Sequence, residues 1–139
     1  MHIARALARE GVNLSLAARS VDELEAVRAE MEGLGVRAIA TECDVTDADD
    51  RSRLLARTEA ELGPVDVLVN NAGIEVVAHF ETSDEADLCR TLDVNLVAAM
   101  LLTRAVVPGM LTRGRGHVVH IASGAGKVGV PYGVAYSTS

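Results

Sequence analysis

The stretch over residues 116–136 reads GHVVHIASGAGKVGVPYGVAY, and it decides how the chain folds. Its β-branched run over 118–121 predicts a buried strand, which a glycine-rich loop follows directly. A helix is expected to begin near Tyr136. In open α/β sheets ligands bind outside the carboxyl ends of the strands, so Ser123 stands where a reacting group would be needed. The glycines between Ser123 and Tyr136 would let the loop fold back and bring the two hydroxyl groups together.

Upstream of this stretch, short apolar runs alternate with helical periodicity. In chain order the pattern predicts a helix around 3–8, a strand over 12–18, a helix over 20–34, a strand over 36–43, a helix over 46–62, a strand over 65–69 and a long helix from Thr82 or Ser83 towards Leu111. Such alternation with short loops is typical of parallel βαβ units. The sequence therefore predicts the α/β class, with a doubly wound parallel sheet.

Two helix starts carry capping signals. Ser20 and Glu23 form a capping box, in which the hydroxyl and the carboxylate satisfy free amides of the first turn. Thr46 and Asp49 have the same spacing and are a second candidate. Both pairs follow a predicted strand, which fits the alternation of strands and helices.

Apolar runs indicate which elements are buried. The strand over 65–69 is short and apolar apart from Asp66, and we expect it to be buried on both faces. In the long helix, Asn95 is expected in the middle of an inward apolar face. The apolar residues of that face are Leu88, Leu92, Leu96, Met100, Val106 and Val107.

Composition narrows the class of protein. The chain has 139 residues, near the size of one domain, and a net charge of −7 without a Lys/Arg cluster, which argues against nucleic acid as a partner. No apolar run approaches the ~20 residues of a membrane span, and charged residues interrupt the amino terminus, so we expect a cytoplasmic protein without a membrane partner. Cys43 and Cys89 lie far apart without metal-ligand spacing, so neither a disulfide framework nor a metal site is expected and both should be buried thiols.

The segments around Ser123 and Tyr136 carry a resemblance to a known family. They read HIASGAG over 120–126 and YSTS over 136–139. This pattern resembles the classical short-chain dehydrogenase/reductase family, in which a Ser is followed thirteen residues later by the Tyr of a Tyr-x-x-x-Lys motif. The family's lysine would be the residue after Ser139, where this sequence stops. Two further matches, Asn70-Asn71-Ala72-Gly73 after an apolar strand and Asn95 in the next helix, support the resemblance.

The resemblance implies a reaction and roles for three residues. Hydride would pass between a nicotinamide cofactor and a carbonyl or secondary alcohol, with Tyr136 transferring the proton and Ser123 bonding the substrate oxygen. Asn95 would distort its helix and hold a water in a proton relay through the lysine. Each residue also has an ordinary interpretation: a loop hydroxyl for Ser123 or Tyr136, and a core amide bonded to backbone for Asn95. Without the lysine, forming tyrosinate at pH 7 would cost about 4 kcal/mol.

Further residues are candidates for cofactor binding. Arg19 ends the strand over 12–18, a position where an Arg suits the 2′-phosphate of NADP and an acid suits NAD, so NADP(H) is favoured over NAD(H). Its alternative is a solvated Arg that pairs with Asp22 or Glu23. By resemblance, Asp44 and Val45 would flank the adenine. Taken alone, Asp44 would be a turn or cap residue.

The string Asn70-Asn71-Ala72-Gly73 is the most specific in the chain, and its last three residues are cofactor candidates. Its small residues would let the backbone come close to the cofactor, and Asn side chains could tie neighbouring strand ends together. Tyr136 would contact the cofactor as well. As a bare peptide the string would be a turn.

The resemblance covers the entire chain, which is shorter than the family at both ends. We therefore expect residues 1–139 to be a single incomplete dinucleotide-binding and catalytic domain, without the first strand, its Gly-rich turn and the C-terminal strands. Loss of that first strand would separate the strands near Leu14 from those near Val67 and Val119. The isolated fragment is expected to be unstable and inactive, and the complete protein a homo-oligomer that acts on a small molecule. The alternatives are a nucleotide-binding pseudoenzyme and a subunit whose long helix serves only to form an oligomer.

Overall fold

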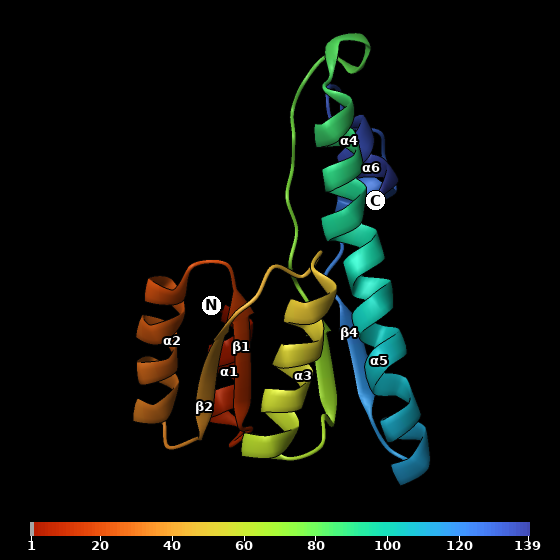
Figure 1. Cartoon of the computed structure of the whole chain (residues 1–139). Coiled ribbons are helices and arrows are strands. Elements are labelled where there is room, and N and C mark those ends of the chain that lie inside the picture. Colours follow the sequence, from red (N-terminus) through yellow and green to blue (C-terminus); the bar gives the residue numbers. More distant parts are fainter. Residues whose placement is uncertain (1) are drawn as a thin grey trace. The chain divides into compact units, whose positions relative to one another are not determined.

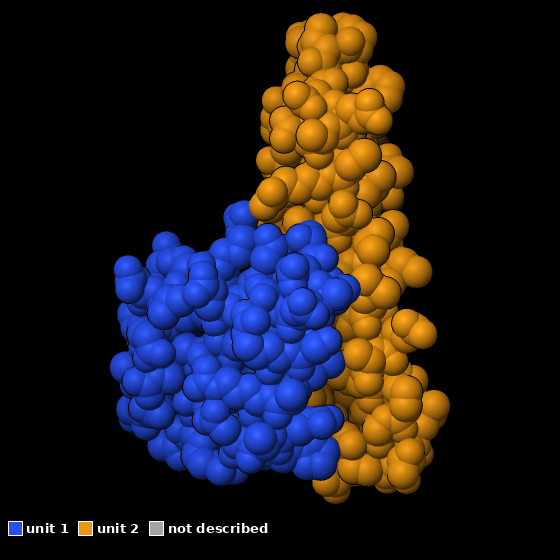
Figure 2. Space-filling view, in the orientation of Figure 1, with its two compact units in different colours: residues 1–64 blue, residues 65–139 orange. Residues whose placement is uncertain are grey.

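The computed structural model describes residues 2–139, which divide after Pro64 into two compact units (Figure 2). Each unit holds one parallel two-stranded sheet: β1 (Leu14–Ala18) with β2 (Ala38–Glu42), and β3 (Val67–Asn70) with β4 (His117–His120). The predicted separation of the strands near Leu14 from those near Val67 and Val119 is confirmed. The described residues form a partial Rossmann-like α/β fold with parallel strands, as the sequence predicts.

The first unit alternates helices with its two strands. The helices are α1 (His2–Arg9), α2 (Val21–Gly33) and α3 (Ala48–Leu62) (Figure 1). One core cluster joins residues from α1, α2 and both strands, and its buried members are Ala8, Leu14, Met31, Val36 and Ala38. Leu14 stands opposite Ala38 in the parallel register, so the two strands present these side chains to the same helices. α3 uses the other face, where the hydroxyls of Ser15 and Thr58 lie 2.7 Å apart.

Side chains of α3 cap the outer edge of β2. Leu14 N donates to Arg37 O, and Cys43 N donates to Ala18 O. The odd-numbered residues in and beside β2 therefore direct their backbone N–H and C=O groups at β1, and the even-numbered residues direct theirs away from β1. Three outward groups bond to α3 side chains that share one helical stripe. Arg57 donates to Ala40 O at 2.6 Å, Arg53 donates to Glu42 O at 3.3 Å, and the Asp50 carboxylate accepts from Asp44 N at 2.8 Å.

The helix starts differ in detail from the sequence expectation. Ser20 is the N-cap of α2, yet its side chain makes no capping hydrogen bond. The N-cap of α3 is Asp47, whose carboxylate accepts from Asp50 N at 2.9 Å, so the predicted cap at Thr46 was wrong by one position. The Thr46 hydroxyl instead donates to Asp44 at 2.7 Å, which leaves Asp47 to cap the helix.

The second unit is built around one long helical segment over residues 85–113 (Figure 1). It consists of α4 (Glu85–Leu92), a π-helical turn η2 (Asp93–Val97) and α5 (Ala98–Arg113), and Asp84 caps its start by accepting from Ala86 N. Gly114 ends it in the left-handed conformation, φ 67°, that favours glycine. The remaining elements are short: η1 (Phe80–Thr82), η3 (Gly124–Gly126) and α6 (Val134–Thr138).

The inward face of the long helix agrees with the prediction only in part. Val106 is buried as expected, whereas Leu96 and Met100 are 40% and 61% exposed. In this region the buried positions recur every four residues, at Val94, Ala98, Leu102, Val106 and Met110. The wider π turn at Asp93–Val97 changes the phase of the helix, so positions extrapolated from α4 at regular helical spacing, such as Leu96 and Met100, miss the buried face.

Two further expectations on burial need correction. β3 is not buried on both faces, and Val67 is 38% exposed, because within the described residues β3 pairs only with β4. Cys89 is exposed, whereas Cys43 is buried and burial raises the pKa of its thiol. The helical segment over 85–113 is long and apolar enough to cross a membrane by length and composition alone, a property that it shares with core helices of soluble proteins.

Candidate functional site

A cleft of about 490 Å³ opens in the second unit at the carboxyl ends of β3 and β4. It is lined by the residues that follow each strand, by the π turn and the start of α5, and by α6. The lining comprises 70–75, Asn95, Leu96, Ala99, Met100, 120–123, Gly126, Tyr136 and Ser139. The structure thus brings together six of the predicted site residues: Asn71, Ala72, Gly73, Asn95, Ser123 and Tyr136.

Asn95 sits in the π turn and connects two walls of the cleft. Its amide oxygen accepts from Ile74 N at 2.8 Å, and its amide nitrogen donates to Ile74 O and to Ser139 Oγ, both at 2.9 Å. The helix is distorted at this residue, as the resemblance implies. The bonds to Ile74 are also those of a core asparagine that pairs with backbone, and the predicted water relay stays a prediction.

Asn70, the first residue of the asparagine string, ties the ends of β3 and β4, with partners that the sequence analysis did not single out. Asn70 Nδ2 donates to Thr103 Oγ1 at 3.2 Å and lies 3.4 Å from Nδ1 of His120, while Ile121 N donates to Asn70 O at 2.9 Å. An amide nitrogen is only a donor, so it pairs with His120 when Nδ1 is the unprotonated nitrogen. The asparagine string hinted at such a tie, but no periodic signal pointed to His120.

Ser123 and Tyr136 both line the cleft, and neither residue is buried. Ser123 is exposed and starts η3, where its Oγ accepts from Ala125 N at 3.2 Å. Its own proton remains available for donation to a ligand. Tyr136 is half-buried on α6, and Ser139 Oγ donates to its carbonyl at 3.0 Å. The arrangement brings a serine and a tyrosine into the lining of one cavity.

The other cofactor candidates belong to the first unit. Arg19 is exposed and has no ion pair within residues 2–139, so the alternative pairing with Asp22 or Glu23 is not seen. Asp44 accepts from Thr46 N at 2.9 Å, which is the bond of a turn residue. Val45 is half-buried, and its carbonyl accepts from Arg51 at 2.7 Å.

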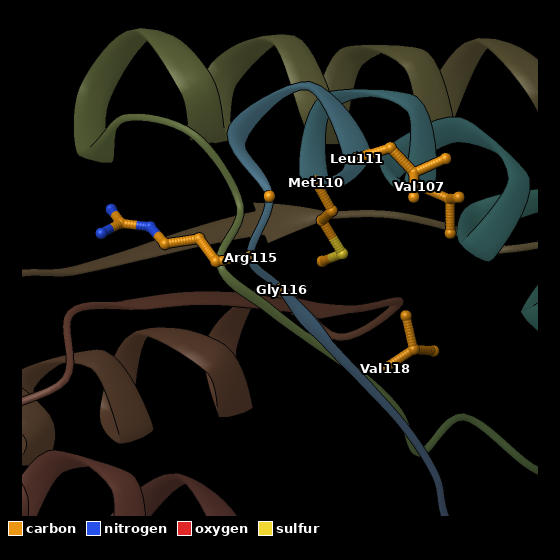
Figure 3. A pocket seen from close by; sticks show the side chains of 7 residues that line it. Val107, Met110, Leu111, Arg115, Gly116 and Val118 are labelled. Atoms are coloured by element: carbon orange, nitrogen blue, oxygen red, sulfur yellow. The ribbon is translucent and has the colours of Figure 1, made fainter.

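A second cavity of about 360 Å³ lies at the opposite end of α5 and β4 (Figure 3). Its lining is mostly aliphatic: Val107, Met110, Leu111, Gly114, Arg115, Gly116 and Val118. A Cβ atom at Gly116 would lie 2.4 Å from Met110 Cγ, so glycine permits this close approach. None of the predicted site residues lines this cavity. Nor does any group of three His, Cys, Asp or Glu side chains suited to a metal occur within residues 2–139.

Comparison with known proteins gives consistent relatives. The family model for short chain dehydrogenases matches residues 1–139. The ketoacyl reductase HetN of Nostoc sp. (strain PCC 7120) is 40% identical over all 139 residues, which cover 48% of that protein. A metagenomic short-chain oxidoreductase in complex with NADP has a TM-score of 0.92 at 38% identity, over 98% of this chain and 62% of its own. The actinorhodin polyketide ketoreductase with NADPH has a TM-score of 0.94 at 36% identity, and the match covers 98% of this chain and 53% of the ketoreductase. The chain spans about half the length of these proteins.

Proposed function

The chain belongs to the short-chain dehydrogenase/reductase family, and from that premise we propose that its protein is an NAD(P)-dependent oxidoreductase acting on a carbonyl or secondary alcohol. The observation that carries the proposal is the shared lining of one cleft by Ser123, Tyr136, Asn71 and Asn95. These residues come from four separate segments of the chain: the ends of β3 and β4, the π turn, and α6. Polar groups that converge at the carboxyl ends of parallel strands are typical of a ligand site in this fold.

The residues of the cleft fit a nicotinamide cofactor. Ala72 and Gly73 carry no bulky side chain, and a Cβ atom at Gly73 would meet only Asn95 Oδ1, at 3.6 Å, so this wall leaves space for a flat ring. The bound cofactor would supply or accept the hydride. Asn71, Ala72, Gly73 and Tyr136 would hold it at the cleft, and Arg19, Asp44 and Val45 are proposed to contact its adenosine part.

In the proposed mechanism, two hydroxyl groups act on the substrate oxygen. Ser123 donates its free proton to that oxygen and orients it. Tyr136 transfers the proton that balances the hydride step, and an adjacent cation is needed to stabilise its phenolate. Ser139 is bonded to Asn95 and to the Tyr136 carbonyl, so the chain segment that would lead to the family's lysine is anchored at the cleft.

The proposal is tested on the whole protein that carries this chain, by NADPH oxidation with a panel of ketones and aldehydes. Ser123→Ala should lower kcat about 100-fold or more, the scale of losing one donor to a developing oxyanion. Thr138→Val is the matched control, because Thr138 lies nearby on α6, does not line the cleft, and donates its hydroxyl to Val134 O of its own helix. NADPH binding without turnover on any substrate would instead favour the nucleotide-binding pseudoenzyme.

NADP(H) is proposed as the preferred cofactor over NAD(H). The exposed guanidinium of Arg19, which is not engaged by an acid within residues 2–139, suits a 2′-phosphate. Arg19→Asp should reverse the ratio of kcat/KM for NADPH over NADH. A ratio that does not change in the variant would contradict this role of Arg19.

The same proposal covers the protein's organisation. Residues 1–139 would be one incomplete dinucleotide-binding and catalytic domain of a cytoplasmic homo-oligomer whose partner is a small molecule, without a nucleic acid or membrane partner. As an isolated polypeptide, residues 1–139 are proposed to be unstable and inactive. Apolar side chains of the second unit, such as Val119 and Ile121 at 40% and 49% exposure, support this point. Cooperative unfolding of the isolated polypeptide together with NADPH oxidation would overturn it.

A further inference from the structure

Tyr132 occupies a backbone conformation that normally belongs to glycine. Its φ is 65°, and within residues 2–139 it is the only residue other than glycine with a positive φ. It is the third residue of a turn closed by Gly133 N donating to Val130 O at 3.1 Å, with Pro131 in second place. Proline second and a positive φ third is the arrangement of a type II turn, where glycine or asparagine is usual. A bulky residue there is strained and persists only where other contacts hold it.

Two contacts hold Tyr132 against the segment that follows β3. Its carbonyl accepts from Ala78 N at 3.0 Å. Its ring meets the ring of His79 edge-on, with centroids 4.7 Å apart and an interplanar angle of 67°. This geometry is the favourable one for aromatic pairs. A glycine at position 132 would fit the turn without strain but would lose the ring contact.

The position of this contact relates it to the cleft. Tyr132 lies between Ser123 and Tyr136 in the chain, on the loop that sets where both hydroxyls stand. The partner segment begins at Ile74, which Asn95 bonds, and reaches Tyr132 at Ala78 and His79. These two segments, which both contribute to the lining of the cleft, are therefore joined at a point outside that lining.

We propose that Tyr132 and His79 form a latch that positions the loop carrying Ser123 and Tyr136, and that this role is why a strained tyrosine stands at the turn. Tyr132 is thus a positioning residue, and its effect on turnover rests on the proposed oxidoreductase function. Small displacements of reacting groups can lower a rate about 100-fold. A latch that fixes the loop should act on kcat more than on cofactor binding.

The test compares three variants of the whole protein. Tyr132→Gly removes the ring and relieves the turn, Tyr132→Phe keeps the ring and the backbone, and His79→Ala removes the partner ring. We expect kcat to fall about tenfold or more in Tyr132→Gly and in His79→Ala, with KM for NADPH unchanged, and to stay near wild type in Tyr132→Phe. His117→Ala, at an exposed histidine on β4, is the matched control and should not change kcat.

A second readout separates the latch from the proposed function. Amide hydrogen exchange at Ala78, whose N–H bonds to Tyr132, should quicken about threefold to tenfold in Tyr132→Gly and His79→Ala, and stay unchanged in Tyr132→Phe. This readout applies even if the wild-type protein shows no turnover, a result that would sink only the oxidoreductase proposal. If both the exchange rate of the Ala78 amide and kcat in Tyr132→Gly stay within twofold of wild type, the latch proposal is wrong.

Discussion

The two units of the chain differ in how completely they cover their strands. In the first unit, four of the five residues of β2 are buried, helices cover both faces of the sheet, and α3 side chains cap the outer edge. In the second unit, no residue of β3 or β4 is buried, although all of them are placed by the same kind of parallel pairing. Strand pairing alone therefore does not make a core. The first unit supplies its own packing, whereas the second unit offers its polar groups to a cleft.

The largest expected effect on stability comes from a matched pair of methionines, one in each unit, which tests the difference in burial between the units. Met31 in α2 is fully buried, and Met100 in α5 is 61% exposed. Met31→Ala should lower the free energy of unfolding by about 2–5 kcal/mol, because it leaves a cavity. Met100→Ala should change it by less than about 0.5 kcal/mol. Denaturant unfolding of the two variants of the whole protein measures both values, and equal losses would contradict the contrast between the units.

The capped edge of β2 gives a smaller effect. Replacing Arg53 and Arg57 together by alanine removes the donors to two outer-edge carbonyls. The free energy of unfolding should fall by about 1–2 kcal/mol, and an uncapped edge should promote association through β2.

The edge variant has a matched control in Arg28→Ala. Within residues 2–139, Arg28 forms ion pairs only with Glu25 and Glu32 of its own helix, so its loss removes a charge without affecting a strand. Sedimentation and denaturant unfolding of both variants should show association and destabilisation only for the Arg53/Arg57 variant. Identical behaviour of the two would argue against the edge cap.

Asp50 gives the smallest effect, a dependence of stability on pH. The backbone N–H of Asp44, and then the guanidinium of Arg53, hold the pKa of Asp50 below its usual value. A carboxyl whose pKa is lower in the folded state stabilises the fold above its unfolded pKa, near 4, and this stabilisation is lost as the pH falls through the folded pKa.

The expected result is that the thermal midpoint of wild type exceeds that of Asp50→Asn at pH 6 and that the difference shrinks towards pH 3. Asp49→Asn, in the same first turn of α3, serves as the control for the loss of one negative charge. A difference between wild type and Asp50→Asn that is constant across this range would contradict the linkage.

The sequence predicts the order and type of the elements well because each carries its own periodicity. α3, for example, ends at Leu62 as predicted and begins within two residues of the expected start. What it does not predict depends on partners far apart in the chain. The apolar residues of β3 indicate burial, but burial also needs another element to cover the strand. The π turn at Asp93–Val97 changes which side of α5 is buried, and no local propensity signals this turn.

The candidate site shows the same division. Asn71, Asn95, Ser123 and Tyr136 could be assigned to one site by family spacing, and all four line one cleft. The contacts of Asn70 with His120 and of His79 with Tyr132 could not be assigned, because they join segments whose proximity only the folded chain reveals. The positive φ of Tyr132 is likewise invisible in a sequence where tyrosine does not favour it.

The central claim, that the phenol of Tyr136 carries proton transfer at the cleft, is tested most directly by two matched tyrosine variants of the whole protein. Both Tyr136→Phe and Tyr132→Phe remove one phenolic hydroxyl from the same loop region, and single-turnover NADPH oxidation measures the chemical step. We predict a fall of about 100-fold or more for Tyr136→Phe with NADPH affinity retained, and a rate near wild type for Tyr132→Phe. A Tyr136→Phe rate within twofold of wild type would contradict the claim.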